Sequence, residues 1–272
     1  MLNPSDIQQD FVRLVIGEMQ RHYGVDFAGY NRNFIRRRIA SRMNRLGISA
    51  PMQYFKILGS DVNEFSQLLQ NLTINTTEFM RNPEVFLKME KFLLPKIAEE
   101  IAGNSLMIWS AGCSRGQEPY SIAMILMKLR IPERMTVRIF ATDIDEIALD
   151  TARKGLYDAA SLSTLSPTDV KIFFERKDNG SFSVKNYLKK MIIFKKHDVV
   201  DGQSLGKFNL IVCRNVSIYF TKNLQMRMYK RFYEDLLPGG YLITGKTETP
   251  PTRFIKEFEC VDLDNRIYRK AR

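Results

Sequence analysis

The sequence predicts a mixed α/β protein, with a mostly parallel sheet covered by helices on both faces and a small helical domain before it. Up to about residue 90, apolar residues recur at helical spacing and no strand pattern interrupts them. From about residue 105, strand, turn and helix patterns alternate. This alternation is typical of parallel βαβ units. We therefore expect a helical domain over residues 1–90 and an α/β domain over residues 91–272.

The helical domain is expected to contain four helices, over residues 6–24, 33–47, 50–60 and 61–73. In the second, Ile35, Ile39 and Met43 form one apolar stripe, and Gly47 is a suitable stop.

Five strands are predicted in the α/β domain, within residues 106–111, 136–146, 191–200, 208–220 and 240–246. Helices are predicted over 118–130 and 145–155, and over 223–240 with a stop at Pro238 and Gly239. Asp178-Asn179-Gly180 lies between two short alternating runs, which is typical of a hairpin. We expect a small antiparallel β subdomain over about residues 172–195.

Bulk properties restrict the function. Three widely spaced cysteines and two histidines suggest neither a disulfide framework nor a metal site, and none is expected. The N-terminus lacks the basic start and apolar core of a signal peptide, and no apolar stretch is long enough to span a membrane, so we expect a cytoplasmic protein. The net charge of +11 implies an anionic partner, which could be nucleic acid, lipid or an acidic protein surface.

The turn after the first strand is rich in small residues. Ser110, Gly112, Ser114 and Gly116 occupy alternate positions, so a ligand could approach the main chain there. The pattern G-x-S-x-G is a poor match to a dinucleotide fingerprint and closer to the cofactor loop of S-adenosylmethionine-dependent methyltransferases. We expect Gly112 to contact the cofactor, although a turn that only links strand to helix is an alternative.

Two further strand ends support an adenosine site. Asp143, at the end of the second strand, could accept hydrogen bonds from both ribose hydroxyls. Asp143 or Asp145 could equally cap the next helix. Tyr219 follows the fourth strand, where an aromatic ring beside a sulfonium is favourable. Phe220 is expected to be a core residue.

Five segments together resemble the CheR-type chemotaxis receptor methyltransferases: "NLTINTTEFMRNPEVF", "IWSAGCSRGQEPYSIAM", "ATDID", "FNLIVCRNVSIYF" and "LLPGGYLITGKTE". The resemblance covers nearly the whole chain. It implies a Rossmann-like class I methyltransferase domain with a β subdomain and an all-helical N-terminal domain. It also implies methyl transfer from S-adenosylmethionine to receptor glutamates, with S-adenosylhomocysteine as product.

The resemblance also assigns residues. Glu118 would contact the amino group of the cofactor and Asp143 its ribose, while Arg81 and Tyr219 would lie closest to the transferred methyl group. Arg81 could orient either the incoming carboxylate or that of the cofactor. The remaining positions that would line the cofactor site are Asn75, Thr77, Asp198, Val199, Arg214 and Asn215.

The chain departs from the family pattern at Arg115 and Gln117, where Thr and Glu are usual, and at Ser217, where an apolar residue is usual. These departures leave open a non-catalytic adaptor that only binds the cofactor. The proposed chemistry needs no general base, because a glutamate side chain is already ionised at neutral pH.

The partner is expected to be acidic. Residues 27–60 contain no acidic residue but several arginines. Three of these, Arg38, Arg42 and Arg45, share one helix face. The resemblance places such a helix against the cytoplasmic helices of chemoreceptors. An RNA methyltransferase is the alternative, but this face lacks interleaved aromatic residues, so no nucleic acid is expected. The short hairpin loop suggests docking without a receptor tail peptide, by a monomer that meets the membrane only through receptors.

Overall fold

The computed structural model describes residues 2–24, 26–73, 75–101 and 103–271. The chain divides into two compact units. A helical unit comprises Met1–Asn75 with Tyr219–Met226, and a sheet unit comprises Thr76–Ile218 with Arg227–Arg272. In the described part of the chain, no helix combines the length and the apolar character needed to cross a membrane.

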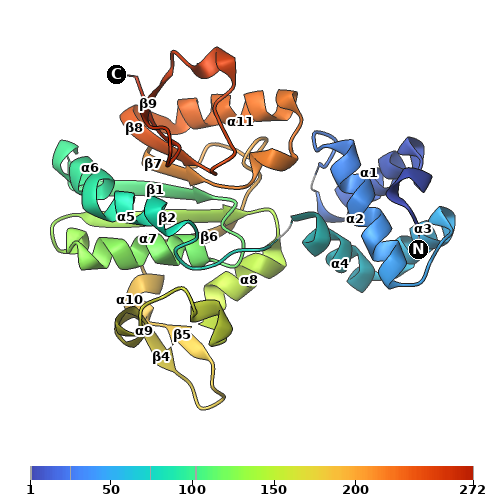
Figure 1. Ribbon diagram of the computed structural model, residues 1–272, viewed down its shortest axis with the longest axis horizontal. Helices are drawn as coiled ribbons and strands as arrows, with labels where there is room; N and C mark the ends of the chain where they lie inside the picture. Colours follow the sequence, from blue (N-terminus) through green and yellow to red (C-terminus); the bar gives the residue numbers. More distant parts are fainter. Residues whose placement is uncertain (1, 25, 74, 102, 272) are drawn as a thin grey trace. The chain divides into compact units, whose positions relative to one another are not determined.

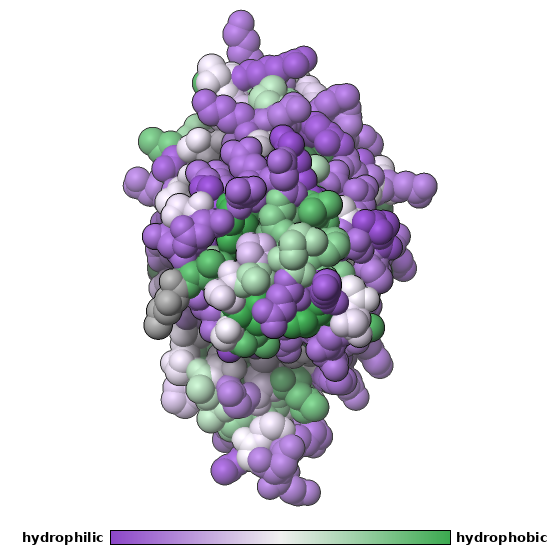
Figure 2. Space-filling model, turned by 90° about the vertical axis from the view of Figure 1, so that its right-hand side faces the viewer, coloured by the Kyte–Doolittle hydropathy of each residue, from purple (hydrophilic) through white to green (hydrophobic). Residues whose placement is uncertain are grey.

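The helical unit contains the four predicted helices. They are α1 (Gln9–Tyr23), α2 (Arg32–Arg45), α3 (Pro51–Ser60) and α4 (Val62–Thr73), preceded by a short 3-10 turn at Pro4–Asp6. Gly24 ends α1 in the left-handed conformation, and the Asn31 side chain caps α2 by accepting from two backbone N–H groups. Figure 2 faces this unit and shows apolar side chains gathered near the centre of the view, with hydrophilic ones around them.

The structure corrects the expectation for Arg42. Its side chain is not on an exposed recognition face, because Arg42 is 5% exposed and forms a bidentate ion pair with Glu64 of α4. Tyr54 of α3 donates a hydrogen bond to the same carboxylate at 2.8 Å. The hydrogen bond from Arg42 to Glu64 raises the pKa of Arg42, so the guanidinium stays charged. Arg42 thus joins three helices of the core.

Removing one member of this pair should destabilise the helical unit. We expect Arg42→Met to lower the free energy of unfolding by about 3–5 kcal/mol, because Glu64 would be left as a buried, unpaired charge. The double variant Arg42→Met/Glu64→Leu should recover most of the loss. Urea unfolding followed by circular dichroism measures both. The exposed Arg45→Met is the matched control, expected to change stability by less than about 0.5 kcal/mol; a loss as small for Arg42→Met would contradict the prediction.

Residues 219–226 follow the fourth parallel strand but pack with the helical unit. Asn31 N–H donates to the Tyr219 carbonyl at 2.8 Å, and Thr221 N–H donates to the Gly29 carbonyl at 2.9 Å. Phe220 is 7% exposed, and its ring packs edge-on against Tyr30, which confirms its expected core position.

The sheet unit is built on a seven-stranded sheet with the order β6-β2-β1-β7-β8-β10-β9 (Figure 1). The strands are β1 (Ser105–Ala111), β2 (Thr136–Asp143), β6 (Ile192–Lys196), β7 (Phe208–Cys213), β8 (Leu236–Thr244), β9 (Phe258–Asp262) and β10 (Ile267–Lys270). The first five named here pair in parallel, as predicted, and β9 and β10 add an antiparallel hairpin that the sequence patterns did not indicate.

Helices cover both faces of this sheet. Residues of α5 (Pro83–Lys88), α6 (Leu94–Glu100), α7 (Gln117–Lys128) and α8 (Glu146–Lys154) share one apolar core with β1 and β2. On the other face, Trp109 of β1 packs against Phe232 of α11 (Lys222–Asp235) with ring centroids 5.6 Å apart. Val85 and Phe86 belong to the sheet core, so the helical unit ends before the boundary expected near residue 90.

The β subdomain differs in extent from the prediction. Its three strands are β3 (Leu156–Tyr157), β4 (Phe174–Arg176) and β5 (Phe182–Val184), in the order β3-β5-β4 beside α9 (Pro167–Phe173) and α10 (Asn186–Lys189). The hairpin turn at residues 178–180 is present, with Gly180 at φ 80°. β3 was not expected because two residues carry no periodic pattern, and residues 192–195 belong to β6 instead.

Helix α11 ends earlier than predicted. It stops at Asp235, and β8 begins at Leu236, so Pro238 and Gly239 lie within a strand. The pairing of β8 with β7 shifts register between Phe208 and Leu210, which accommodates the extra residues as a bulge.

Candidate functional site

The carboxyl edge of the parallel strands collects most of the residues singled out from the sequence. Gly112 follows β1, Asp143 ends β2, Asp198 follows β6, and Arg214 follows β7. Because these strands are parallel and adjacent, their carboxyl ends meet at one edge of the sheet. The chain leaves β1 towards β2 on one side and returns as β7 on the other, which makes β1 the topological switch point where ligands bind.

The turn after β1 is held close to both neighbouring strands. Gly112 and Cys113 N–H groups donate to the Thr142 carbonyl at 2.8 and 2.9 Å. Gly112 has φ 78°, and a Cβ there would lie 2.5 Å from a methyl group of Val216. Residue 112 must therefore be glycine for steric as well as conformational reasons.

The structure shows that Asp145, not Asp143, caps the next helix. Asp145 caps α8, accepting from the N–H groups of Ile147 and Ala148. The Asp143 carboxylate accepts from Ser114 N–H at 2.8 Å and Asp145 N–H at 3.0 Å and is 8% exposed. Burial raises the pKa of Asp143 to about 6, although these two hydrogen bonds oppose the shift.

Glu118 lies in the first turn of α7. Its side chain accepts a hydrogen bond from Ser110 Oγ at 2.8 Å, and its second oxygen lies 3.7 Å from Arg214 Nη1. Burial raises the pKa of Glu118, opposed by the nearby charge of Arg214. Burial likewise lowers the pKa of Arg214. At 3.7 Å the positive charge of Arg214 offsets only part of the negative charge of Glu118, so Glu118 can still attract a cation.

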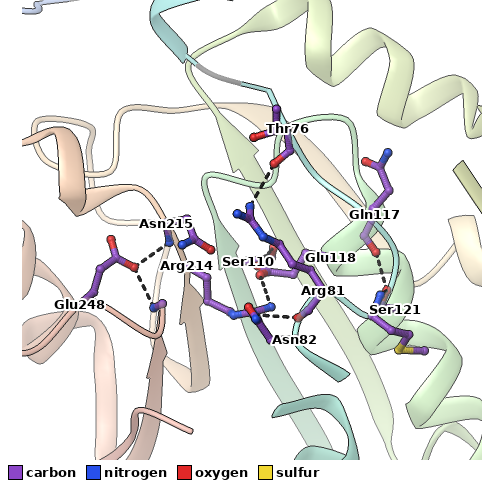
Figure 3. A network of polar contacts seen from close by, with 12 residues as sticks. Thr76, Arg81, Asn82, Ser110, Gln117, Glu118, Ser121, Arg214, Asn215 and Glu248 are labelled. Atoms are coloured by element: carbon purple, nitrogen blue, oxygen red, sulfur yellow. Dashed lines mark hydrogen bonds and ion pairs between the residues drawn. The ribbon is translucent and has the colours of Figure 1, made fainter. Parts of the chain in front are cut away.

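Arg214 also holds the segment before α5. Its Nη2 donates to the Arg81 carbonyl at 2.8 Å and to Asn82 Oδ1 at 2.6 Å. Figure 3 shows Arg214 reaching this segment close to Glu118. Arg81 turns the other way, and its Nη1 donates to the Thr76 carbonyl at 3.0 Å. The half-buried Arg81 side chain is thereby placed beside the carboxyl edge.

The end of β6 is shaped by turn contacts. Asp198 Oδ1 accepts from Val200 N–H at 2.7 Å and Asp201 N–H at 3.1 Å, and Val199 is 8% exposed. His197 Nε2 lies 2.8 Å from the Gln203 carbonyl, so Nε2 carries the proton of this contact. Burial lowers the pKa of His197. The buried His197 ring packs against Trp109, so we assign it a role in the fold.

The three remaining predicted residues fall in both units. Asn75 and Tyr219 belong to the helical unit, where Asn75 Nδ2 donates to Thr73 Oγ1 and the ring centroids of Tyr219 and Phe34 are 4.6 Å apart. Thr77 belongs to the sheet unit and is half-buried.

The positions that depart from the family pattern fit the structure. Arg115 is exposed, while Gln117 is buried and its side chain points away from Glu118 in Figure 3. Ser217 is buried and donates a hydrogen bond from Oγ to Glu248 at 2.7 Å. Asn82 and Glu248 were missed as site residues, because no local pattern marks a side chain whose partners are distant in sequence.

These features suit S-adenosylmethionine. Gly112 leaves room beside the main chain, and the buried Asp143 and the half-buried Glu118 are acids, which can accept hydrogen bonds from hydroxyl and ammonium groups such as that molecule carries. Among the described residues, no group of three His, Cys, Asp or Glu side chains could hold a metal ion.

Comparisons with known proteins agree with this geometry. Residues 12–73 match the CheR methyltransferase all-alpha domain, and residues 75–267 match the CheR methyltransferase SAM-binding domain.

Similar whole proteins include chemotaxis protein methyltransferases of Listeria monocytogenes, 34% identical over 89% of this chain and 91% of that protein, and of Borreliella burgdorferi, 32% identical over 90% and 89%. An uncharacterised 104.1 kDa protein of Rhodobacter capsulatus is 29% identical over 91% of this chain. The match covers 26% of that larger protein. A solved structure of the N-methyltransferase NodS from Bradyrhizobium japonicum with S-adenosylhomocysteine is similar at a TM-score of 0.41 and 14% identity, covering 69% of this chain and 88% of that one.

The two matched domains follow each other in the order of the helical and sheet units, and the second contains every strand of the carboxyl edge described above. The chain therefore belongs to the CheR family of S-adenosylmethionine-dependent methyltransferases.

Proposed function

We propose that this protein methylates glutamate side chains on the cytoplasmic helices of chemoreceptors. Relatives named chemotaxis protein methyltransferases support a role in chemotaxis. The observation that carries the choice of acceptor is the set of ionisable groups at the carboxyl edge. Glu118 and Arg214 are partly paired, Asp143 is held by two N–H groups, and His197 is packed. None of these four is positioned as a general base, which suits an acceptor that is already ionised.

S-adenosylmethionine would supply a methyl group activated by its sulfonium. We assign its amino group to Glu118 and its ribose to Asp143. Gly112 would allow close approach to the main chain, and Asp198 and Val199 would border the adenine. Arg214 and Asn215 would complete the wall on the β7 side. Further lining residues assigned to the site are Asn75, Thr77 and Arg81.

Catalysis would depend on positioning and on the exclusion of water. Arg81 carries a positive charge beside Glu118 and Arg214 and could orient a carboxylate without removing a proton. Tyr219, whose ring is fixed against Phe34, would present an aromatic face to the sulfonium.

The helical unit is the proposed receptor-binding surface. Arg45 is exposed, and the Arg38 guanidinium lies 5.3 Å from the centre of the Phe34 ring, so both remain candidates where Arg42 does not. Large apolar side chains also stay exposed in this unit: Leu14, Leu46, Met52 and Val62. Exposed apolar groups on a unit that also carries exposed arginines suit an acidic amphipathic helix. We further propose that docking needs no receptor tail peptide and that the protein acts as a cytoplasmic monomer.

The reaction class can be tested with labelled methyl groups. We expect label to pass from S-adenosylmethionine to receptor cytoplasmic fragments and to be released as methanol by mild alkali, because the product is an ester. Alkali-stable label on protein or RNA would contradict glutamate methylation and indicate nitrogen or carbon methylation. Cofactor binding without transfer to any receptor fragment would instead support an adaptor.

Cofactor affinity should depend on pH through Asp143. The ribose hydroxyls would donate to the ionised carboxylate, so binding favours ionisation and lowers the pKa from its free value of about 6. We expect the affinity for S-adenosylhomocysteine to be constant above neutral pH and to fall as pH decreases through 6. Calorimetry at several pH values measures this.

Asp143→Asn should weaken binding about 10- to 100-fold at neutral pH, because hydrogen bonds to a charged acceptor are lost, and should remove the pH dependence. Asp150→Asn, which changes an exposed carboxylate on α8, is the control. A pH dependence that persists in Asp143→Asn would show that another group titrates.

Receptor recognition should depend on Arg38 and Arg45. Arg38→Ala and Arg45→Ala are expected to raise the KM for receptor fragments several-fold, roughly as for a rim charge, while the KM for S-adenosylmethionine stays unchanged. The rise in KM should shrink as salt is added, because salt screens the attraction between these arginines and the receptor in the wild type as well. Arg130→Ala, an exposed arginine of the sheet unit, is the matched control. Equal losses for all three variants would argue against a specific surface.

A further inference from the structure

The loop after β7, residues 214–217, has a conformation that its own sequence does not favour. Asn215 has φ 60°, in the left-handed region that few residues other than glycine adopt without cost. The next residue, Val216, lies against Gly112 of the cofactor turn. Surrounding contacts must therefore hold this loop in place.

Those contacts come from one side chain, Glu248, which lies just after β8. Its carboxylate accepts from the N–H groups of Asn215 at 2.6 Å, Val216 at 3.0 Å and Ser217 at 2.7 Å. Ser217 Oγ and Gly245 N–H, each at 2.7 Å, supply two more hydrogen bonds. Glu248 is 4% exposed, so one buried carboxylate satisfies three successive backbone donors of the loop. Figure 3 shows the bond to Asn215.

A glycine makes room for this carboxylate. A Cβ at residue 245 would lie 2.4 Å from Glu248 Oε2 and 2.8 Å from Asn215 N. A side chain at this position would force either the Glu248 carboxylate or the loop to move. The absence of a side chain at residue 245 thus lets Glu248 approach both Gly245 N–H and the loop.

We propose that Glu248 is a positioning residue of the methyltransferase reaction, acting through residues 214–217. By fixing the loop, it sets the place of Asn215 and of Arg214, and Arg214 in turn holds the carbonyl of Arg81. The inference rests on the proposed assignment of Arg214 and Asn215 to the cofactor site. It extends that assignment to a residue that need not touch the cofactor.

Glu248→Gln tests the proposal in the full-length protein. The amide nitrogen cannot accept, so at least one loop N–H would face another donor. We expect the Kd for S-adenosylhomocysteine, measured by calorimetry, and the KM for S-adenosylmethionine to rise about tenfold or more. Both are measured at a temperature where circular dichroism shows a folded chain. Glu259→Gln, an exposed carboxylate on β9, is the isosteric control and should stay within about twofold of the wild type.

Gly245→Ala provides a second variant, which keeps the carboxylate but displaces it from the loop, and it decides the question if Glu248→Gln does not fold. It should also weaken cofactor binding. Ser217→Ala removes one hydrogen bond of five and should have a smaller effect, about two- to fivefold.

The proposal is overturned if the folded variants at 245 and 248 bind S-adenosylhomocysteine like the wild type and only lose thermal stability. That result would mean that Glu248 stabilises the fold without positioning the site. Failure of the wild type to methylate receptor fragments would count against the proposed function, but the binding comparison would still decide the role of Glu248.

Discussion

The parallel pairing of β1 with β2 on one side and with β7 on the other determines where every group of the site can lie. The register places Ala111 opposite Thr142 and Ser110 opposite Val212, so the three strands end at nearly the same level. The turn after β1 then bonds to the end of β2 through the Thr142 carbonyl and touches the β7 loop through Val216. A change in either pairing would move the turn that the cofactor is expected to approach.

Burial controls the chemistry at this edge more than the number of charges does. Removal from water raises the pKa values of Glu118 and Asp143 and lowers that of Arg214. Each charged form is thus less stable here than it would be in water. A ligand that brings an ammonium, hydroxyls or a carboxylate can restore part of the lost solvation. The site is preorganised in this sense, since its dipoles and charges are in place before a ligand arrives.

Local patterns in the sequence were sufficient for the helices of the first unit, the five parallel strands and the glycine turn, but they left open whether Asp143 or Asp145 caps α8. Each of these features is determined by residues that are close together in the sequence. The sequence could not show which arginine of α2 is buried, because Arg42 is selected by Glu64, 22 positions away. Glu248 is separated by more than 30 positions from the loop that it holds, and only the fold brings them together.

The β7 loop also connects two sets of fixed contacts across a very short length of chain. Ser217 is held by Glu248 within the sheet unit, and the Tyr219 carbonyl is held by Asn31 within the helical unit. Only Ile218 lies between them. An inserted or deleted residue next to Ser217 or Tyr219 would have to leave these backbone contacts in place, whereas the exposed hairpin turn at residues 178–180 could change length at little cost. During evolution, we expect this segment to vary in its side chains more readily than in its length.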